Sequence, residues 1–297
     1  MANRVTVAPM RATLIRIVVG SLVVLAACGA PSRGDDDDDD TPPGDGPGGN
    51  QDNCSDEAKL IYVVDENNVM STYDPTTKMF NDLGSLACPS AGTPFSMGID
   101  RNAGAWVLFS TGQLFNVDTS TSALTCTETT WQPNREGLMV FGMGFSTDVA
   151  GGNTDTLFIA GGVGPSVPTS SLNTLNVATL DPTPVGTVND WPELTGTGDA
   201  ELWGFFPSQN SRIEKIDKTS GAALQTFQLP TLAGQPSAWA FAFFGGDFHI
   251  FLMKDLEFST TVHQVNGQTG AIVGSTSTSG RRIVGAGVST CAPTVLL

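Results

Sequence analysis

From residue 54 to the C-terminus, the chain is a succession of short apolar runs separated by polar turns. The runs are rich in Val, Ile, Phe, Tyr and Trp, as in residues 60–64 and 239–244, and Gly, Asn, Asp, Ser and Thr interrupt them. No sustained period of about 3.6 residues, the mark of an amphipathic helix, runs through them. Short runs bounded by turn residues are typical of β-strands. The pattern therefore predicts an all-β domain over residues 54–297.

One short unit recurs five times in this domain. Each copy is a strand that ends in a β-branched or aromatic residue, then Asp, Asn or Ala, usually followed by a turn with Thr and Gly. The marking residues are Asp74, Asp118, Ala178, Asp217 and Asn266, at successive separations of 44, 60, 39 and 49 residues. Four-stranded propeller blades repeat at about 40 to 50 residues. The spacing predicts a β-propeller of five blades, with an inserted loop over residues 150–171 in the long third interval.

Upstream of the marks lie strands with a small residue near their start. Small residues suit innermost strands, because the blades converge on an axis and space tapers there. Four of these strands are found at residues 98–100, 144–146, 198–200 and 242–244. The fifth lies at residues 285–289, after the last unit, whereas the N-terminal unit that begins at residue 60 lacks an inner strand. We therefore expect the C-terminal strand to complete the N-terminal blade and close the ring.

The N-terminal segment has a different pattern. Arg4, Arg11 and Arg16 accompany an apolar run over residues 17–27, and no acidic residue lies among them. The run has about 11 residues, whereas a membrane-spanning helix needs about 20. A basic start followed by a short apolar run and small residues is typical of a secretory signal peptide.

The apolar run ends in Leu-Ala-Ala-Cys at residues 25–28. This motif resembles the lipobox of bacterial lipoproteins, in which the chain is cleaved before the cysteine and the sulfur takes a diacylglycerol. The resemblance implies a signal peptide over residues 1–27, lipidation of Cys28 and, because Gly29 rather than Asp follows, sorting to the outer membrane. Two or three acyl chains give stable anchoring. We therefore expect a cell-envelope protein held to the membrane by lipid.

Residues 28–53 are rich in Asp, Gly and Pro and contain almost no apolar side chain. Such a segment cannot bury enough surface to fold, so we expect a disordered tether. The six Asp of residues 35–40 repel one another and lack the ligand spacing of a Ca²⁺ loop, which favours a solvated linker over an ion site. Removal of the signal peptide takes away three of the 14 basic residues and changes the formal charge from −16 to −19. This acidic balance argues against nucleic acid as a partner.

Four cysteines belong to the β domain: Cys54, Cys88, Cys126 and Cys291. An even number in an exported chain predicts two disulfides, for which three pairings exist. Closure of the ring by the C-terminal strand brings Cys54 beside Cys291, and elimination then pairs Cys88 with Cys126, which we expect in outer strands of adjacent blades. A zinc site is the alternative, although the chain has no C-x₂-C motif and no neighbouring Cys and His.

The repeats of residues 54–291 resemble bacterial repeat propellers of the WD40-like and YVTN type, and more closely the uncharacterised lipoprotein propellers of bacterial genomes. They are divergent, with no Gly-His or Trp-Asp signature. Six or seven blades, or a β-sandwich, are the alternatives to five blades.

The domain shows no recognisable catalytic constellation. It lacks the Gly-x-Ser-x-Gly elbow of serine hydrolases. His249 and His263 fall in predicted strands of the fifth unit, where a structural role is the first interpretation and a base or metal ligand the second. Asp100, Asp199 and Glu201 lie in or just after predicted inner strands, so they could approach the axis as ligand-binding carboxylates. The alternative is a structural role, in which carboxylates at strand ends accept hydrogen bonds from the backbone amides of turns.

The leading hypothesis is a non-enzymatic, membrane-tethered binding module for a protein, glycan or small ligand, without a cofactor. Aromatic runs at residues 202–206 and 239–244 could stack on sugars, although packing between blades is the first interpretation of them. The alternative is a lactonase-like propeller hydrolase that uses the axial carboxylates with a Ca²⁺ ion.

Overall fold

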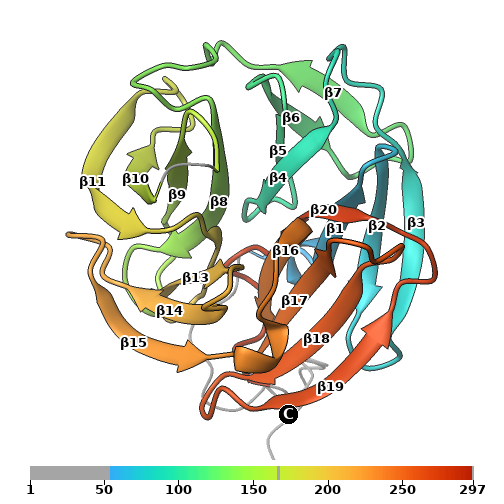
Figure 1. The fold of residues 1–297 in the computed structure, drawn as a ribbon. Coiled ribbons are helices and arrows are strands. Elements are labelled where there is room, and N and C mark those ends of the chain that lie inside the picture. Colours follow the sequence, from blue (N-terminus) through green and yellow to red (C-terminus); the bar gives the residue numbers. More distant parts are fainter. Residues whose placement is uncertain (1–53, 166–167, 296–297) are drawn as a thin grey trace, which may run out of the picture. The chain divides into compact units, whose positions relative to one another are not determined.

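The computed structural model describes residues 54–165 and 168–295. Their strands form five antiparallel sheets of four strands each, arranged as blades around one axis (Figure 1). The fold is a five-bladed β-propeller, so the predicted fold class and blade number are confirmed. Cys28 and the segments predicted to be a signal peptide (residues 1–27) and a tether (residues 28–53) lie outside the described residues.

The strands of each blade are given from the axis outward. Blade 1 contains β20 (Ile283–Gly287), β1 (Ile61–Asp65), β2 (Val69–Asp74) and β3 (Met79–Ser85). Blade 2 contains β4 (Pro94–Ile99), β5 (Ala105–Phe109), β6 (Leu114–Asp118) and β7 (Thr125–Glu128). Blade 3 contains β8 (Val140–Thr147), β9 (Asp155–Gly162), β10 (Thr169–Leu175) and β11 (Pro182–Asn189). Blade 4 contains β12 (Glu193–Gly196), β13 (Leu202–Phe206), β14 (Arg212–Ile216) and β15 (Ala223–Gln228). Blade 5 contains β16 (Pro236–Phe244), β17 (Asp247–Lys254), β18 (Thr261–Asn266) and β19 (Ile272–Ser277). Two 3₁₀ helices are η1 (Glu57–Lys59) and η2 (Pro230–Leu232). Among the described residues, no helix is long and apolar enough to cross a membrane.

The C-terminal strand closes the ring as expected. β20 pairs with β1 in antiparallel register, with Val63 opposite Ala286 and Val64 opposite Gly285. The first blade is thus assembled from both ends of the domain. The last described residues continue beyond it: Thr290 Oγ1 donates to Asp155 of blade 3 at 2.7 Å, and the backbone oxygen of Pro293 accepts from Gly245 N of blade 5 at 2.7 Å. Residues 288–294 therefore cross one end of the axis.

The inner strands of every blade are buried on both faces, because each of the five apolar clusters fills the space between two neighbouring blades, whereas outermost strands such as β3 and β15 are largely exposed. Trp203 and Phe205 pack between blades 4 and 5, and Phe206 packs between blades 3 and 4. The aromatic run at residues 202–206 is therefore packing, as first interpreted. Glycine allows the inner strands to approach closely, since a Cβ on Gly196 would lie 2.1 Å from the backbone oxygen of Phe145.

The recurring polar mark is an Asx turn that joins the third and fourth strands of each blade. Its side-chain oxygen accepts the backbone N–H two residues later, which fixes the turn locally. The five acceptors and their distances are Asp74 at 2.8 Å, Asp118 at 2.9 Å, Asn176 at 2.9 Å, Asp217 at 2.7 Å and Asn266 at 3.2 Å. The sequence predicts Ala178 as the mark of blade 3. The residue with this role is Asn176, because Ala178 only donates its backbone N–H to the Asn176 side chain.

Two segment assignments from the sequence are wrong. Residues 150–171 are not an inserted loop, because they contain all of β9 and the start of β10. Residues 198–200 are not an inner strand: they form the turn after β12, where Ala200 has a φ of 62°. Small residues serve both tight turns and inner strands, so composition alone does not separate the two.

Both predicted disulfides are present. Cys54 bonds Cys291 across a separation of 237 residues, and Cys88 bonds Cys126 across 38 residues. Cys126 lies in β7, an outer strand as expected, whereas Cys88 follows the end of β3. The first bond joins the chain just before blade 1 to the segment just after β20, so it ties the ring at its closure.

Candidate functional site

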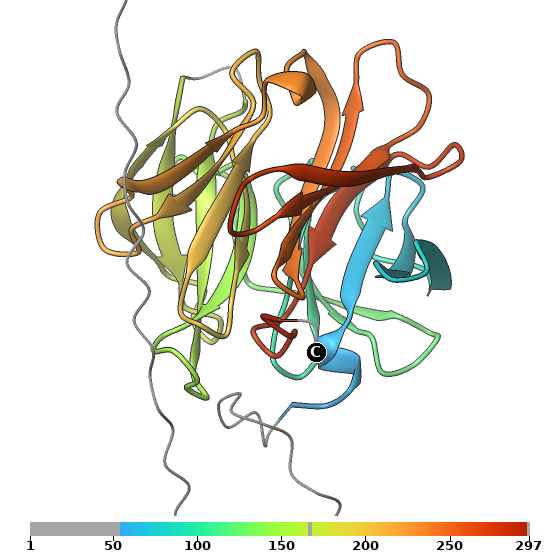
Figure 2. The ribbon, with the colours of Figure 1, turned by 90° about the horizontal axis from the view of Figure 1, so that it is seen from below.

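The two ends of the propeller axis differ. Seen from the side, the start of the described chain and the C-terminal end lie together at the lower face, and η2 lies at the opposite face (Figure 2). The upper face is formed by the loops that enter the inner strands and by the loops between the second and third strands of the blades. Two depressions of the described surface lie there.

The larger depression, here called the groove, has a volume of about 590 Å³. It lies between blades 3, 4 and 5 and takes its lining from their upper loops. Its lining residues are Pro165, Asp190, Trp191, Pro207, Ser208, Gln209, Asn210, Gln235, Pro236 and Trp239. The wall thus combines two indole rings with a run of amide, hydroxyl and carboxylate side chains. Its size falls within the usual range of small-molecule sites.

The smaller depression, here called the axial cavity, has a volume of about 200 Å³ and opens at the starts of the inner strands. Its lining residues are Glu66, Thr93, Pro94, Phe95, Glu193, Ser237, Ala238, Trp239, Arg282 and Val284. Trp239, near the start of β16, lines both the groove and the axial cavity. The two hollows therefore share one aromatic wall.

Glu193 places a buried carboxyl group in the axial cavity. It is the first residue of β12 and is 2% exposed. Its Oε1 accepts a hydrogen bond from Ser96 Oγ of blade 2 and one from the backbone N of Met143 of blade 3, the latter at 3.4 Å. Burial raises the pKa of Glu193 well above its usual value, and these two hydrogen bonds only partly oppose that effect. Burial therefore favours the neutral form of this carboxyl group more than it would be favoured in an exposed glutamate.

The other charged groups on the cavity wall neutralise each other. Arg282 Nη1 lies 3.1 Å from Glu66 Oε2, and Arg282 Nη2 donates to the backbone oxygen of Ser237 at 2.5 Å. The cavity thus presents an ion pair, the buried carboxyl group of Glu193 and the apolar side chains of Phe95, Trp239 and Val284.

Replacing Glu193 with Gln is expected to stabilise the protein at neutral pH. In the unfolded chain Glu193 ionises near pH 4.5, whereas its raised pKa keeps it protonated in the fold, so stability is lost as the pH rises from 4.5 toward the folded pKa. Gln keeps an oxygen for Ser96 and Met143 and carries no charge. Urea unfolding at pH 5 and pH 8 should show a gain in the free energy of unfolding that is larger at pH 8. The exposed Glu128→Gln is the control, and an equal gain at both pH values would contradict the assignment.

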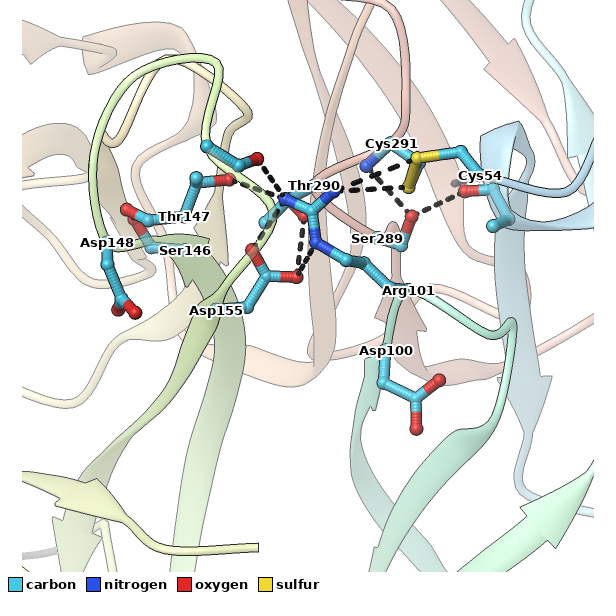
Figure 3. Close-up of polar contacts among 12 residues, drawn as sticks. Cys54, Asp100, Arg101, Ser146, Thr147, Asp148, Asp155, Ser289, Thr290 and Cys291 are labelled. Atoms are coloured by element: carbon cyan, nitrogen blue, oxygen red, sulfur yellow. Dashed lines mark hydrogen bonds and ion pairs between the residues drawn. A yellow bond between two sulfur atoms is a disulfide. The ribbon is translucent and has the colours of Figure 1, made fainter. Parts of the chain in front are cut away.

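The opposite end of the axis is closed by a polar hub centred on Arg101 (Figure 3). Arg101 Nη2 donates to Asp155 Oδ1 at 2.9 Å and to the backbone oxygen of Gly152 at 2.9 Å, and Nη1 lies 3.8 Å from Cys54 Sγ. The hub joins blades 2 and 3 to the disulfide and to the C-terminal segment.

The three carboxylates expected near the axis lie at this lower end, and two of them, Asp100 and Glu201, are engaged within their own blades. Asp100 accepts from the backbone N of Asn102 and Gly104, both at 2.9 Å, and in Figure 3 it points away from the hub. Glu201 forms an ion pair with Lys215 and accepts from Trp203 Nε1 at 2.8 Å. Asp199 is exposed in the turn after β12. Within residues 54–165 and 168–295, no group of three His, Cys, Asp or Glu side chains is placed to hold a metal ion.

The two histidines lie in blade 5, as expected. His249 of β17 is 1% exposed, its ring lies 6.0 Å from that of Tyr73 in blade 1, and burial lowers its pKa to about 4. His263 of β18 contacts Ser275 Oγ through Nδ1 at 2.9 Å. Neither residue lines the groove or the axial cavity. Both positions agree with a structural role.

Sequence reasoning misses Glu193 and interprets Trp239 only as packing. The sequence does contain an indication of Glu193. It is a single acidic residue between Trp191 and Leu194, in an apolar stretch where an unpaired charge is disfavoured. The signal goes unnoticed because the inner strand of blade 4 is assigned to residues 198–200.

No family model matches the sequence, and no curated protein is significantly similar to it. Among solved structures, a protein of unknown function from Bacteroides caccae has a TM-score of 0.44 and 9% identity over 77% of this chain and 97% of its own. The Dos1 propeller has a TM-score of 0.40 and 14% identity over 73% of this chain and 55% of its own. Kuenenia stuttgartiensis hydrazine synthase has a TM-score of 0.40 and 13% identity over 65% of this chain and 51% of its own. The class, a five-bladed propeller with a ligand-sized groove on one face, therefore rests on the strand order and the site.

Proposed function

We propose that this protein is a glycan-binding module of the cell envelope, anchored by lipid on Cys28, and that the groove binds the glycan. The observation that carries the proposal is the lining of the groove. Indole rings stack on the apolar faces of sugars, and amide, hydroxyl and carboxylate groups bond their hydroxyls. The groove combines Trp239 with Gln209, Asn210, Gln235 and other polar side chains in one depression of about 590 Å³.

The acidic balance of the chain agrees with an uncharged ligand. A formal charge of −16 repels polyanions at long range but leaves neutral sugars unaffected. A protein partner would instead favour an extended apolar patch with a polar rim. The groove is instead a depression in which polar side chains alternate with tryptophan and proline. A neutral oligosaccharide is therefore the ligand class that these residues fit best.

The groove proposal predicts that the double variant Gln209→Ala/Asn210→Ala loses about tenfold or more in affinity, because two ligand hydrogen bonds are removed. The probes are neutral trisaccharides of glucose, mannose and N-acetylglucosamine, titrated into the full mature protein in detergent while tryptophan fluorescence is followed. Both side chains are exposed, so the fold is retained. Gln225→Ala on β15, also an exposed amide, is the matched control. Wild-type affinity in the double variant, or no binding of any probe to the wild type, would refute the groove as a glycan site.

The anchor proposal rests on the lipobox resemblance at residues 25–28. We expect the wild type to incorporate radiolabelled palmitate and to sediment with membranes, and Cys28→Ser to lose both properties because the thiol that takes the lipid is absent. Ser32→Ala, four residues further along, should leave both unchanged. Labelled Cys28→Ser protein would disprove the modification at this residue.

The alternative, a lactonase-like hydrolase with Ca²⁺ on axial carboxylates, gains no support from the positions of Asp100, Asp199 and Glu201. Two of these carboxylates already bond turn amides, a lysine or an indole N–H within their own blades. A binding role is therefore the better-supported proposal for the upper face.

A further inference from the structure

The carboxyl group of Glu193 is only half satisfied. Both of its hydrogen bonds, from Ser96 Oγ and from the backbone N of Met143, reach Oε1. Oε1 is therefore the oxygen engaged by the protein, which leaves Oε2 as the oxygen that can present the acid proton to a ligand. Within the part of the chain that the structure describes, Oε2 has no hydrogen-bond partner, while the residue lines the axial cavity. Oε2 is not among the fully enclosed unpaired polar atoms of the described residues, so it reaches the cavity, where an O–H can donate to an oxygen atom of a bound group.

The surroundings of Glu193 favour an uncharged partner. The axial cavity has apolar walls of Phe95, Ala238, Trp239 and Val284. The titratable groups on its wall besides Glu193 are Glu66, from the turn after β1, and Arg282, which precedes β20, and these pair with each other at 3.1 Å. β4, β8 and β16 contribute no further charged side chain to the wall. An anion or cation entering the cavity would find no free counter-charge.

We propose that the axial cavity is a subsite for one neutral oxygen-bearing group of the ligand, a sugar hydroxyl or carbonyl, which accepts a hydrogen bond from the Glu193 carboxylic acid. The volume of about 200 Å³ suits a single small ring or branch. Trp239 forms a wall of both hollows, so the cavity lies directly beside the groove in which we propose that the glycan binds. This inference rests on the proposed glycan-binding function and names the group that the ligand must carry.

Proton linkage follows from this geometry. Only the protonated acid donates through Oε2, so binding should weaken as the pH rises through the folded pKa of Glu193, which burial raises. Glu193→Gln retains a donor in the form of its amide N–H and should bind independently of this titration. Glu193→Leu is close in size and has no donor, so it should bind about tenfold more weakly at every pH.

The experiment uses the full mature protein labelled with ¹³C at glutamate side-chain carboxyls, with glycerol as the probe. The Glu193 signal is identified by its absence in Glu193→Gln. We expect glycerol to shift this signal in a saturable manner below the folded pKa, and to do so equally in Gln209→Ala/Asn210→Ala. Acetate, as the charged probe, should leave the signal unchanged. The free energy of unfolding of each variant is measured in parallel.

The outcomes separate the cavity from the groove. An unmoved Glu193 signal with glycerol and with every neutral trisaccharide would overturn the subsite, even where the groove variants lose glycan binding. A saturable shift with glycerol, together with wild-type glycan affinity in the groove variants, would support the cavity and refute the groove. For folded Glu193→Leu, unchanged affinity for a bound trisaccharide would also overturn the subsite.

Discussion

Replacing Cys54 and Cys291 together with Ala is expected to lower the free energy of unfolding by about 5 kcal/mol, since the lost cross-link closes a loop of 237 residues. In the chain-entropy view, a longer loop restricts the unfolded chain more. Urea or guanidinium unfolding of the oxidised protein, followed by tryptophan fluorescence, gives the difference. The bond also fastens the only blade built from both ends of the domain, so its loss should expose β20 and β1 first in amide hydrogen exchange.

The second disulfide supplies the matched control. Cys88→Ala with Cys126→Ala opens a loop of 38 residues between neighbouring blades and should cost about 3 to 4 kcal/mol. Exchange at β20 and β1 should stay close to that of the wild type. A larger loss from this pair than from Cys54 and Cys291 would contradict the view that ring closure is the main role of the first bond.

Arg101→Met is expected to destabilise the fold by about 3 to 5 kcal/mol, because it leaves the carboxylate of Asp155 buried without its partner. The Asp155 side chain is only 8% exposed, and Arg101 Nε lies 2.8 Å from its Oδ2. The same guanidinium donates to Gly152 and Thr147, so one substitution releases contacts between blades 2 and 3. Equilibrium unfolding at low and moderate salt measures the loss.

A double-mutant cycle identifies the origin of that effect. Arg101→Met combined with Asp155→Asn removes the orphaned charge and should recover part of the stability lost by the single variant. Arg135→Met breaks an ion pair whose partner, Asp181, is 58% exposed, and should cost about 1 kcal/mol or less. Equal losses for Arg101→Met and Arg135→Met would show that burial does not strengthen the Arg101 hub.

The ring and its closure could be predicted from the sequence because they depend on turn residues that repeat once per blade and on the number of inner strands. Asp74, Asp118, Asp217 and Asn266 each end a third strand with an Asx turn, so the periodicity is visible in single residues. The C-terminal inner strand has no blade of its own, and the N-terminal blade lacks an inner strand. The two therefore have to combine in one blade. The disulfide pairing follows from that arrangement without further information.

The candidate site could not be predicted in the same way, because it depends on which loops meet above the axis. Gln209 and Gln235 belong to different loops and read as ordinary turn residues. Glu193 contradicts the apolar pattern of its strand, and its two donors come from residues 97 and 50 positions away in the sequence. Such contacts exist only after five blades have packed.

The position of Cys54 also decides how the propeller would respond to traction. A pull applied to the chain at Cys54 is passed by a covalent bond to Cys291. From Cys291 the load spreads through the adjacent Thr290 to Asp155 of blade 3 and through Pro293 to Gly245 of blade 5. Because β1 cannot be peeled from β20 without loading that bond, the oxidised protein should resist forces that would unzip a propeller closed by hydrogen bonds alone.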